Sequence, residues 1–404
     1  MIVQAGNAGK DIRSDCLVEM ESADSGGIRI ELDSRVERMY GASIRKLVEE
    51  GMRYFGISHA RIRVEDQGAL PFVIMARLEA AARQIKKDIP EFLPPMLKEN
   101  EYPSFPERHR FSRLYLPGNT PKMMLNAGIH KPHGMILDLE DSVAPARKAE
   151  ARVLVRNALR AVSFYGAERM VRINQWPAGR EDLPYVIPHR VHTLLVPKCE
   201  DPEQIMELEA VVETIKKDHG VKEPVFLMPI IESALGVEMA YRIACSSKQV
   251  VALAIGLEDY TADLGTRRSD EGTESFYARS RLVNACKAAR IQAIDSVFSD
   301  VADTEGLART IEHSKQLGFE GMGCIHPRQI PVIHAGYAPG NEEIEKARKI
   351  VLAYEEAESK GLGVVSVGTK MIDPPVVKRA LRIMDLAVEM GIVSKEWRNE
   401  PHED

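Results

Sequence analysis

Polar and charged residues follow nearly every apolar, strand-like run beyond residue 110, at the point where the run ends. An apolar strand has no structural need to end in this way. These residues are Pro117-Gly118-Asn119, Asp138-Leu139-Glu140-Asp141, Arg172-Ile173-Asn174, Lys198, Glu232-Ser233, Glu258-Asp259, Asp295 and His326. Most are carboxylates, and oxygen ligands of this kind suit a hard cation such as Mg²⁺ or Mn²⁺. The pattern therefore predicts a divalent-metal site.

Glu232 and Asp259 are the first choices for metal ligands, because each ends a strongly apolar run. An acid at such a place can instead cap the helix that follows. Arg172 is suited to bind a substrate carboxylate through bidentate hydrogen bonds. Its structural alternative is an ion pair with Asp138 or Glu140.

Lys198, His326 and two cysteines have weaker chemical interpretations. A lysine at a strand end could form a Schiff base, as in one class of aldolases, but neighbouring acids would keep Lys198 charged and a metal would already supply the electrophile. His326 could act as a base, and a capping or core histidine fits equally well. Cys199 and Cys324 have no triad-like surroundings, so we expect them to be packing residues.

Eight strand-like runs alternate with helical stretches beyond residue 110, which predicts an α/β fold, a (β/α)₈ TIM barrel. The runs are Arg113–Pro117, Gly134–Leu139, Arg169–Asn174, His192–Pro197, Val225–Ile231, Val250–Gly256, Ile291–Asp295 and Phe319–Ile325. In such a barrel the chemistry lies at the carboxyl ends of the strands, where the polar residues occur. No G-x-G-x-x-G follows any run, so a dinucleotide site has no support.

The first 85 residues predict a small α+β domain. Leu17–Met20, Ile28–Leu32 and Ala60–Asp66 have strand patterns, a helix pattern runs from Val36 to Tyr54, and a further apolar strand is expected near Phe72–Ile74. A lead rich in glycine, alanine and asparagine precedes the first of these strands.

Five prolines between residues 89 and 110 predict a stiff linker, with an irregular arm packed on the larger domain as the alternative. The expected domains are residues 1–85, a linker at 86–110, a barrel at 111–335 and a helical C-terminal extension at 336–404.

Composition excludes several classes of protein. The chain has 404 residues, 44% hydrophobic and 28% charged, with a formal net charge of -6. It has no basic stripe for nucleic acid, no apolar run long enough for a membrane span, and no signal-peptide pattern. Its five cysteines are scattered, so a disulfide scaffold or structural zinc site is not expected, and a cytoplasmic location is.

Residues 111 to about 392 resemble the citrate lyase beta subunit, within the citrate lyase-like and 2-keto-acid aldolase barrels. The shared motifs are R-L-Y-L-P-G-N (113–119), L-D-L-E-D-S-V (137–143), V-R-I-N (171–174), V-P-K (196–198), I-E-S-A-L-G (231–236), G-L-E-D-Y (256–260) and H-P-R-Q-I (326–330). The resemblance implies that Glu232 and Asp259 bind magnesium, and that Arg172 and Glu232 contact the substrate. We also expect Asn119 and Glu140 to contact the substrate from the same rim.

A C-terminal lid is implied by the malyl- and citramalyl-thioester relatives of this family, which carry a catalytic aspartate in a D-G-P-like motif that reaches a neighbouring subunit. The matching stretch, residues 368–375, has Asp373 followed by proline instead of glycine. The resemblance therefore implies a catalytic Asp373 and a homo-oligomer, trimeric or hexameric.

Residues 5 to 83 resemble a second protein, the citrate lyase gamma subunit, which is the acyl carrier of the same complex. The matching stretches are residues 8–15, 36–45, 64–70 and 76–81. In that carrier a serine before an aspartate bears a phosphoribosyl-dephospho-coenzyme A arm, which implies Ser14 as the attachment site. Arg13 stands where the family has a small residue, and the alternative is a carrier-like domain that is no longer modified.

The predicted activity is a metal-dependent carbon–carbon lyase that cleaves a citryl, or other 3-hydroxyacyl, thioester to oxaloacetate and an acetyl thioester. Backbone donors near Gly118 and Asn119 are expected to stabilise the enolate oxygen. Acyl exchange would need a partner, the citrate lyase alpha subunit. The alternatives are a malyl- or citramalyl-coenzyme A lyase acting on free thioesters, and a non-catalytic carrier and assembly subunit.

Overall fold

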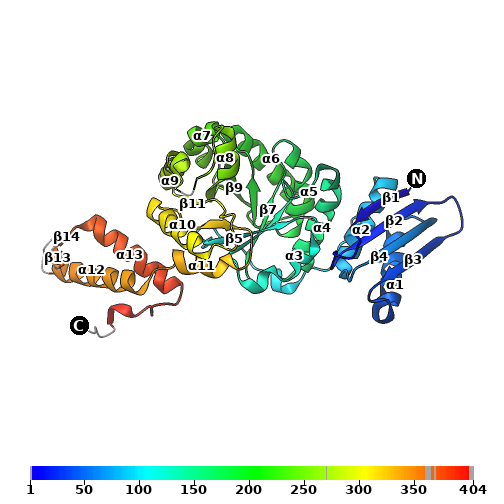
Figure 1. Cartoon of the computed structure of the whole chain (residues 1–404), viewed down its shortest axis with the longest axis horizontal. Helices are drawn as coiled ribbons and strands as arrows, with labels where there is room; N and C mark the ends of the chain where they lie inside the picture. Colours follow the sequence, from blue (N-terminus) through cyan, green and yellow to red (C-terminus); the bar gives the residue numbers. More distant parts are fainter. Residues whose placement is uncertain (1, 270, 360–364, 368–369, 400–404) are drawn as a thin grey trace. The chain divides into compact units, whose positions relative to one another are not determined.

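The computed structural model describes residues 2–269, 271–359, 365–367 and 370–399. The chain divides into two compact units, residues 1–333 and 334–404. The first unit contains a small N-terminal domain, an irregular segment and a barrel, and the second contains a pair of long helices (Figure 1). Among the described helices, none combines the length and apolar composition that a membrane span requires.

Eight parallel strands form the barrel, in the order in which they occur in the chain. They are β5 (Ser112–Pro117), β6 (Gly134–Asp138), β7 (Glu168–Arg172), β8 (Thr193–Val196), β9 (Phe226–Ile231), β10 (Ala252–Ile255), β11 (Gln292–Ile294) and β12 (Met322–Cys324). β12 pairs with β5, and a parallel bridge between Asp295 and Met322 joins the β11 edge to β12. All eight strands predicted from the sequence are confirmed, and so is the TIM barrel.

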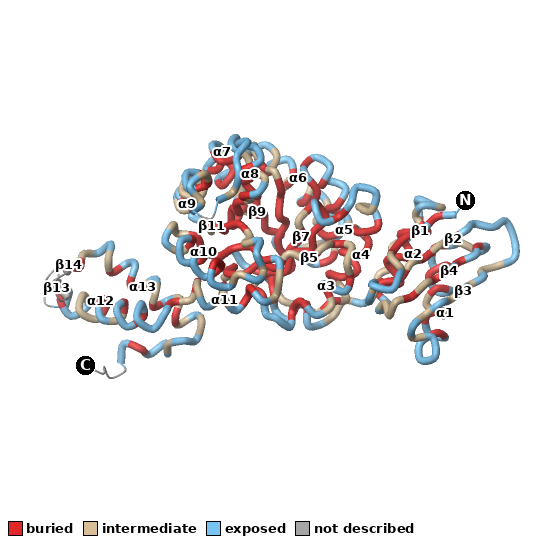
Figure 2. The backbone as a smooth tube through the Cα atoms, viewed as in Figure 1, coloured by how far each residue is buried: buried red, intermediate tan, exposed pale blue. Residues whose placement is uncertain are grey.

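The barrel interior is filled by apolar side chains from alternate positions of neighbouring strands. Figure 2 shows buried residues along these strands. The central cluster is Ile136, Met170, Leu195, Met228, Ile230, Ala252, Ala254 and Ile294. A fully buried aliphatic side chain of this size contributes about 1.5–3 kcal/mol, so this packing is a rigid base for the residues at the strand ends.

Helices follow the barrel strands, and three of them begin at side-chain caps. They are α3 (Pro121–Leu125), α4 (Lys148–Ala161), α5 (Leu183–Val186), α6 (Pro202–His219), α7 (Ala234–Ala244), α8 (Leu257–Asp263), α9 (Phe276–Ala289), α10 (Thr304–Leu317) and α11 (Gln329–Tyr337). Asp201 forms a capping box at the start of α6, and Ser233 and Asp303 cap α7 and α10 through their side chains. The strand-to-helix turns are thereby fixed at the carboxyl rim.

The N-terminal domain is a four-stranded sheet with two helices. Its elements are β1 (Ile2–Gly6), β2 (Cys16–Ser22), β3 (Ile28–Ser34), α1 (Glu37–Tyr54), β4 (Ala60–Asp66) and α2 (Pro71–Ile85), and the sheet order is β1-β2-β4-β3. The lead at residues 2–6 is therefore a strand paired with β2, which the sequence analysis did not predict.

The strand expected near Phe72–Ile74 is wrong, because these residues lie in α2. Pro71 stands in the first turn of this helix, where proline is favoured. Residues 72 to 82 are all buried, so the helix presents apolar residues on every side and lacks the period that distinguishes a helix from a buried strand.

The proline-rich segment at 86–110 is an irregular arm on the barrel and not a free spacer, which corrects the expectation of a stiff linker. The Asn100 side chain donates to the Val162 carbonyl at 2.7 Å, and Tyr102 Oη donates to the Ala167 carbonyl at 2.6 Å. Arg110 forms a fully buried ion pair with Glu168, with Nε 2.7 Å from Oε2. These contacts favour the packed-arm alternative.

The second unit is built on α12 (Asn341–Ser359) and α13 (Pro374–Glu389), with a short antiparallel hairpin of β13 (Val365–Val367) and β14 (Lys370–Ile372) between them. Ile344, Val351, Val377, Met384 and Trp397 are among the buried residues of its own core. The unit is thus helical, as the sequence predicts for the C-terminal extension.

Candidate active site

Arg172 ends β7 and is held by two acids from the turn after β6. Its Nε and Nη2 atoms each lie 2.7 Å from the Asp138 carboxylate, and its Nη1 lies 2.8 Å from Glu140 Oε2. Burial opposes the charged forms, but this pairing lowers the pKa of Asp138 and raises that of Arg172. The ion pairs foreseen as the structural alternative are therefore present, and they fix the guanidinium plane at the carboxyl rim.

Tyr115 supports the same guanidinium from below. Its ring lies 5.3 Å from the Arg172 guanidinium carbon, within cation–π range. Burial raises the pKa of the Tyr115 hydroxyl, so it stays neutral. The sequence analysis did not find this residue, because an aromatic inside a strand reads as core.

Lys198 follows β8 in a left-handed conformation, with φ of 50°. Such a backbone is uncommon for a non-glycine residue and is characteristic of functional turns. Its Nζ lies 3.3 Å from Glu140 Oε1 and 3.9 Å from Asp141 Oδ1. Burial works against the charge, yet these acids raise the pKa of Lys198. A charged amine is a poor nucleophile, so Schiff-base chemistry is disfavoured here.

Glu232 directly follows β9 and is only 5% exposed. Its Oε1 accepts a hydrogen bond of 2.6 Å from the Lys198 backbone N–H. The helix-capping alternative does not describe it, because Ser233 caps α7 by accepting from the Gly236 N–H at 3.1 Å. Burial, together with repulsion from Asp259 and Glu140, raises the pKa of Glu232 to about 8.

Asp259 lies in the first turn of α8, half-buried, and no side chain caps this helix. Gly256 precedes it, and a Cβ on Gly256 would collide with the Glu232 side chain. The glycine thus allows the β10–α8 turn to approach Glu232 closely. Glu232 and Asp259 follow neighbouring strands, β9 and β10, and their carboxylates repel each other.

This pair of carboxylates fits a divalent cation that completes its shell with water and substrate. Among the residues the structure describes, no group of three or more His, Cys, Asp and Glu side chains is arranged to hold a metal by itself. Mg²⁺ often uses one or two carboxylates and keeps several waters. Burial and the repulsion from Asp259 and Glu140 raise the pKa of Glu232, and a bound cation would offset both by favouring the charged carboxylate.

Asn119 stands in the turn after β5, and its backbone carbonyl accepts from Arg77 Nη2 at 3.1 Å. The Gly118 N–H donates to the Asp138 carbonyl at 2.8 Å. The Gly118 N–H is engaged in this way because β5 continues strand-like beside β6. It is not free to stabilise an enolate, so the expectation of a backbone donor in this turn stays a prediction for the Asn119 N–H alone.

His326, for which a base and a capping or core role were both open, and the two cysteines make local contacts. His326 Nδ1 accepts from the Arg328 N–H at 3.1 Å, within the turn that leads to α11. Burial raises the pKa of Cys199 and of Cys324 to about 12, so both thiols stay protonated and pack in the barrel wall.

Ser14 lies in the N-terminal domain and Asp373 in the second unit. Ser14 is partly exposed, has φ of 58°, and donates its backbone N–H to the Gln67 carbonyl at 3.0 Å. The segment around it is thus held in place and is not a mobile lead. Asp373 belongs to the second unit, where its side chain accepts from the Val376 N–H at 3.3 Å and caps α13. Residues 368 and 369 of its motif lie outside the described part of the chain.

A family model described as HpcH/HpaI aldolase/citrate lyase matches residues 112–327, which is the barrel. The chain belongs to this family. The N-terminal domain, residues 3–85, matches an acyl-carrier model described as malonate decarboxylase delta subunit (MdcD). An acyl-carrier-like domain and a citrate lyase-like barrel are therefore joined in one chain.

Named relatives of this member of the HpcH/HpaI aldolase/citrate lyase family are lyases. Citrate lyase subunit beta of Leuconostoc mesenteroides subsp. cremoris is 40% identical over 295 residues, 72% of this chain and 97% of the relative. Human mitochondrial citramalyl-CoA lyase is 32% identical over 290 residues, 69% of this chain and 85% of the relative. The solved structure of CitE from Mycobacterium tuberculosis with magnesium, acetoacetate and coenzyme A is 28% identical, has a TM-score of 0.58, and covers 70% of this chain and 99% of that one. The chain is thus a carbon–carbon lyase by family.

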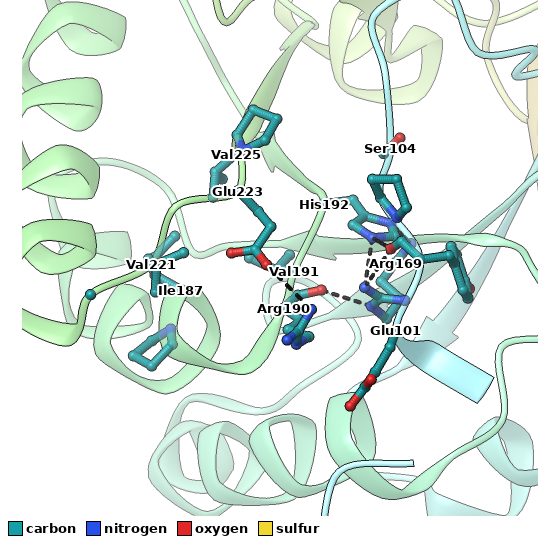
Figure 3. A pocket seen from close by; sticks show the side chains of 15 residues that line it. Glu101, Ser104, Arg169, Ile187, Arg190, Val191, His192, Val221, Glu223 and Val225 are labelled. Atoms are coloured by element: carbon teal, nitrogen blue, oxygen red, sulfur yellow. Dashed lines mark hydrogen bonds and ion pairs between the residues drawn. The ribbon is translucent and has the colours of Figure 1, made fainter. Parts of the chain in front are cut away.

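A cavity of about 340 Å³ lies at the amino end of the barrel, opposite the rim that carries Arg172, Glu232 and Asp259. Its walls are the amino ends of β7 to β9 and the arm near Tyr102 (Figure 3). The buried Arg169 donates to the Arg190 carbonyl at 2.7 Å and lies 4.7 Å from the Tyr102 ring. In a TIM barrel this end contributes to stability and not to chemistry. We therefore assign the cavity to the place where the arm packs on the barrel, and not to catalysis.

Proposed function

We propose that this chain is a metal-dependent citryl-thioester lyase that acts on an acyl group carried by its own N-terminal domain. The observation that carries the proposal is the arrangement at the carboxyl rim, where Arg172 is fixed by Asp138 and Glu140, and Glu232 faces Asp259 across neighbouring strand ends. The named relatives support the reaction class, and the carrier-like domain supports an arm-borne substrate.

Substrate orientation would rest on Arg172. Asp138 takes the Nε and Nη2 edge of the guanidinium and Glu140 lies beside Nη1, which leaves the second N–H groups of Nη1 and Nη2 to bind a carboxylate of the four-carbon half. Because Asp138 holds the guanidinium at two points, binding costs little further ordering. Glu140 and Asn119 would border the same substrate.

Glu232 and Asp259 would hold Mg²⁺ or Mn²⁺. When bound, this cation supplies positive charge next to the hydroxyl oxygen that becomes the new carbonyl. The CitE structure with magnesium and acetoacetate supports the choice of metal. Lys198 adds a fixed positive charge beside Glu140 and, through its backbone N–H, orients Glu232.

The reaction itself is a retro-Claisen cleavage. A base removes the hydroxyl proton, the new carbonyl forms, and the carbon–carbon bond breaks. Its electron pair passes to the thioester enolate, which takes up a proton to give the acetyl thioester, and oxaloacetate is the other product. Asp373 of a neighbouring subunit is our candidate for the acid–base group.

Ser14 would carry the phosphoribosyl-dephospho-coenzyme A arm. An attached acyl group has a much higher effective concentration at the barrel than the same group in solution. A separate citrate lyase alpha subunit would exchange the acyl group onto the arm. If no such subunit binds, this part of the proposal fails.

Intact-mass analysis of protein from its native host tests the arm directly. We expect a mass increase equal to the coenzyme A-derived group, mapped to Ser14 by peptide fragmentation and absent from a Ser14→Ala variant. An unmodified Ser14 would instead favour a lyase for free citramalyl- or malyl-coenzyme A, which the 32% identity to human citramalyl-CoA lyase supports as the second candidate.

Metal binding has a test that does not depend on turnover. Titration of Mn²⁺ followed by electron paramagnetic resonance should show one site in the wild type and loss of that site in Glu232→Gln. Arg63→Gln, an exposed change in the N-terminal domain, is the control. A Glu232→Ala variant with wild-type turnover would show that the measured turnover does not come from this rim, which would favour the non-catalytic carrier interpretation of the chain.

A further inference from the structure

Arg77 is a fully buried arginine in the middle of α2, a helix whose buried residues are mostly apolar. Its Nε and Nη2 atoms each lie 2.9 Å from the carboxylate of Asp15, the residue next to Ser14. Asp15 also accepts from the Cys16 N–H at 2.9 Å and from Asn7 Nδ2 at 2.9 Å. The segment that precedes β2 is therefore fastened to α2 through this one guanidinium.

The same guanidinium contacts the barrel. Nη2 donates to the Asn119 carbonyl at 3.1 Å, in the turn after β5, and Nη1 lies 3.5 Å from Glu150 Oε1 on α4. Glu150 in turn accepts from the Gly6 N–H at 2.9 Å, and Arg147 donates to the Gly6 carbonyl at 2.8 Å. Arg77 thus connects the Ser14 segment to a turn at the carboxyl rim, where the candidate substrate residues lie.

A second set of contacts joins the two domains farther along the same helices. α2 packs on α4, and Arg156 of α4 forms a fully buried ion pair with Glu79 of α2 at 2.7 Å. Asn157 donates to the Phe72 carbonyl at 3.0 Å. Buried, hydrogen-bonded charge pairs fix a single geometry, because any shift leaves charges unpaired. These contacts are those of a docked domain and not of one that swings on a tether.

We propose that the carrier-like domain works docked on its own barrel, and that Arg77 is a positioning residue that holds the Ser14 segment against the Asn119 turn. The acyl arm would then start at a fixed point beside the barrel mouth, and only the arm itself would move. This inference rests on the proposed function for its consequence in turnover, and on the contacts above for the docking itself.

The physical advantage is entropic. A carrier on a free linker must search a volume set by the linker length. A docked carrier has already lost that translational and rotational freedom when the chain folds. The proline-rich arm fits this arrangement, because it is packed on the barrel and adds little freedom between the domains. Arm-borne substrate should therefore depend on Arg77 far more than substrate that diffuses in from solution.

Hydrogen exchange on the full chain tests the docking without any substrate. In Arg77→Gln we expect at least about tenfold faster exchange both at residues 6–16 and at residues 117–121. Arg77→Lys should restore part of the protection, because it keeps the charge but loses the bidentate geometry. Arg63→Gln, an exposed arginine of the same domain that pairs with Glu19, should match the wild type.

Arg147→Ala covers the case in which Arg77→Gln does not fold. Arg147 is partly exposed, so its loss leaves no fully buried charge, and exchange should rise at residues 6–7 while the barrel remains folded. Unchanged exchange at residues 117–121 in a folded Arg77→Gln protein would overturn the coupling of the two turns, whatever substrate the enzyme uses.

Turnover then separates this inference from the proposed function. With arm-borne citryl groups we expect kcat to fall by about tenfold or more in Arg77→Gln, while kcat/KM for free citryl-coenzyme A added in solution stays within about twofold of wild type. Equal losses with both substrates would overturn the positioning role. If Ser14 carries no arm, the proposed function fails, and the exchange experiment still decides whether the domain is docked.

Discussion

Glu232 shows how the sequence and the fold produce a reactive position at the scale of one residue. Five apolar residues of β9 drive the backbone into the barrel wall and leave Glu232 at its end, almost without solvent. The Lys198 N–H stabilises its charge, while Asp259 and Glu140 oppose it. The acids near Glu232 outnumber the bases, so the local electrostatic potential favours binding of a cation at its carboxylate.

Gly256→Ala is a residue-scale test of this arrangement. The new Cβ would collide with the Glu232 side chain, so the carboxylate must rotate away from Asp259. We expect kcat/KM to fall about 100-fold, since misplacement by about 1 Å has that effect, and Mn²⁺ binding to weaken in parallel. Gly340→Ala, where a Cβ meets nothing, should change neither. Normal metal binding in Gly256→Ala would argue against Glu232 as a ligand.

The residues at strand ends could be found from the sequence, because a polar residue after an apolar strand has few structural explanations. Arg172, Glu232 and Asp259 were identified in this way, and the structure brings them to one rim. Tyr115 and Arg77 could not be identified from a strand-end position. Their roles depend on which elements lie beside them in space, although two charged residues, Arg77 and Glu79, in the otherwise apolar stretch 72–82 were a visible signal.

At the scale of elements, the eight barrel strands were predictable and α2 was not. Each barrel strand is bounded by turn residues and followed by a periodic helix, so length and context identify it. α2 lies between its own sheet and α4, and burial on all sides removes the helical period. The arm at 86–110 was ambiguous for a related reason, since proline excludes regular structure but does not say whether a segment packs.

The arm should contribute measurably to stability through Glu168. This residue accepts from Arg110, from Ser104 Oγ at 2.7 Å and from Thr193 Oγ1 at 2.8 Å, all buried. Glu168→Gln leaves the Arg110 charge uncompensated, so the free energy of unfolding should fall by about 3–5 kcal/mol in urea denaturation. Glu223→Gln breaks only an exposed pair and should cost under about 0.5 kcal/mol. Equal effects would contradict the anchoring role.

Buried histidines at the amino end of the barrel predict an acid-sensitive element. Burial and the nearby Arg169 lower the pKa of His192 to about 3. Above the unfolded pKa of about 6.5 the residue is neutral in both states, so its contribution to stability is complete. Below 6.5 only the unfolded state gains the proton, and stability falls until pH 3 is reached.

Urea denaturation at pH 7.5 and pH 5.5 measures this effect. His192 should account for about 1.4 kcal/mol of the loss between these values. His192→Asn, whose side-chain oxygen can accept from the Arg169 N–H in place of Nδ1, should show a correspondingly smaller loss. His219→Asn, at an exposed position, should behave like the wild type. An unchanged pH dependence in His192→Asn would show that folded His192 takes up a proton as readily as the unfolded residue, and would contradict the lowered pKa.

At the scale of the whole molecule, the chain combines a carrier-like domain, a barrel and a helical unit with separate cores. The first two share buried ion pairs, Arg77–Glu150 and Arg156–Glu79, and form one unit, while residues 334–404 form another. A catalytic residue on a separately folded unit can serve a neighbouring subunit as readily as its own. Asp373 is in such a position, and the side chain that caps α13 would also be the proposed acid–base group.

Mixing two inactive variants decides whether Asp373 acts in a neighbouring subunit. Asn is as good a helix cap as Asp, so Asp373→Asn should fold normally and lose turnover, and Glu232→Gln should lose it by failing to bind metal. If the lid reaches across, co-expressed or dissociated and reassembled mixtures contain subunit pairs with one intact rim and one intact lid, and activity returns. Mixtures that stay inactive, or a wild type that is monomeric by light scattering while fully active, would show that Asp373 does not act in a neighbouring subunit.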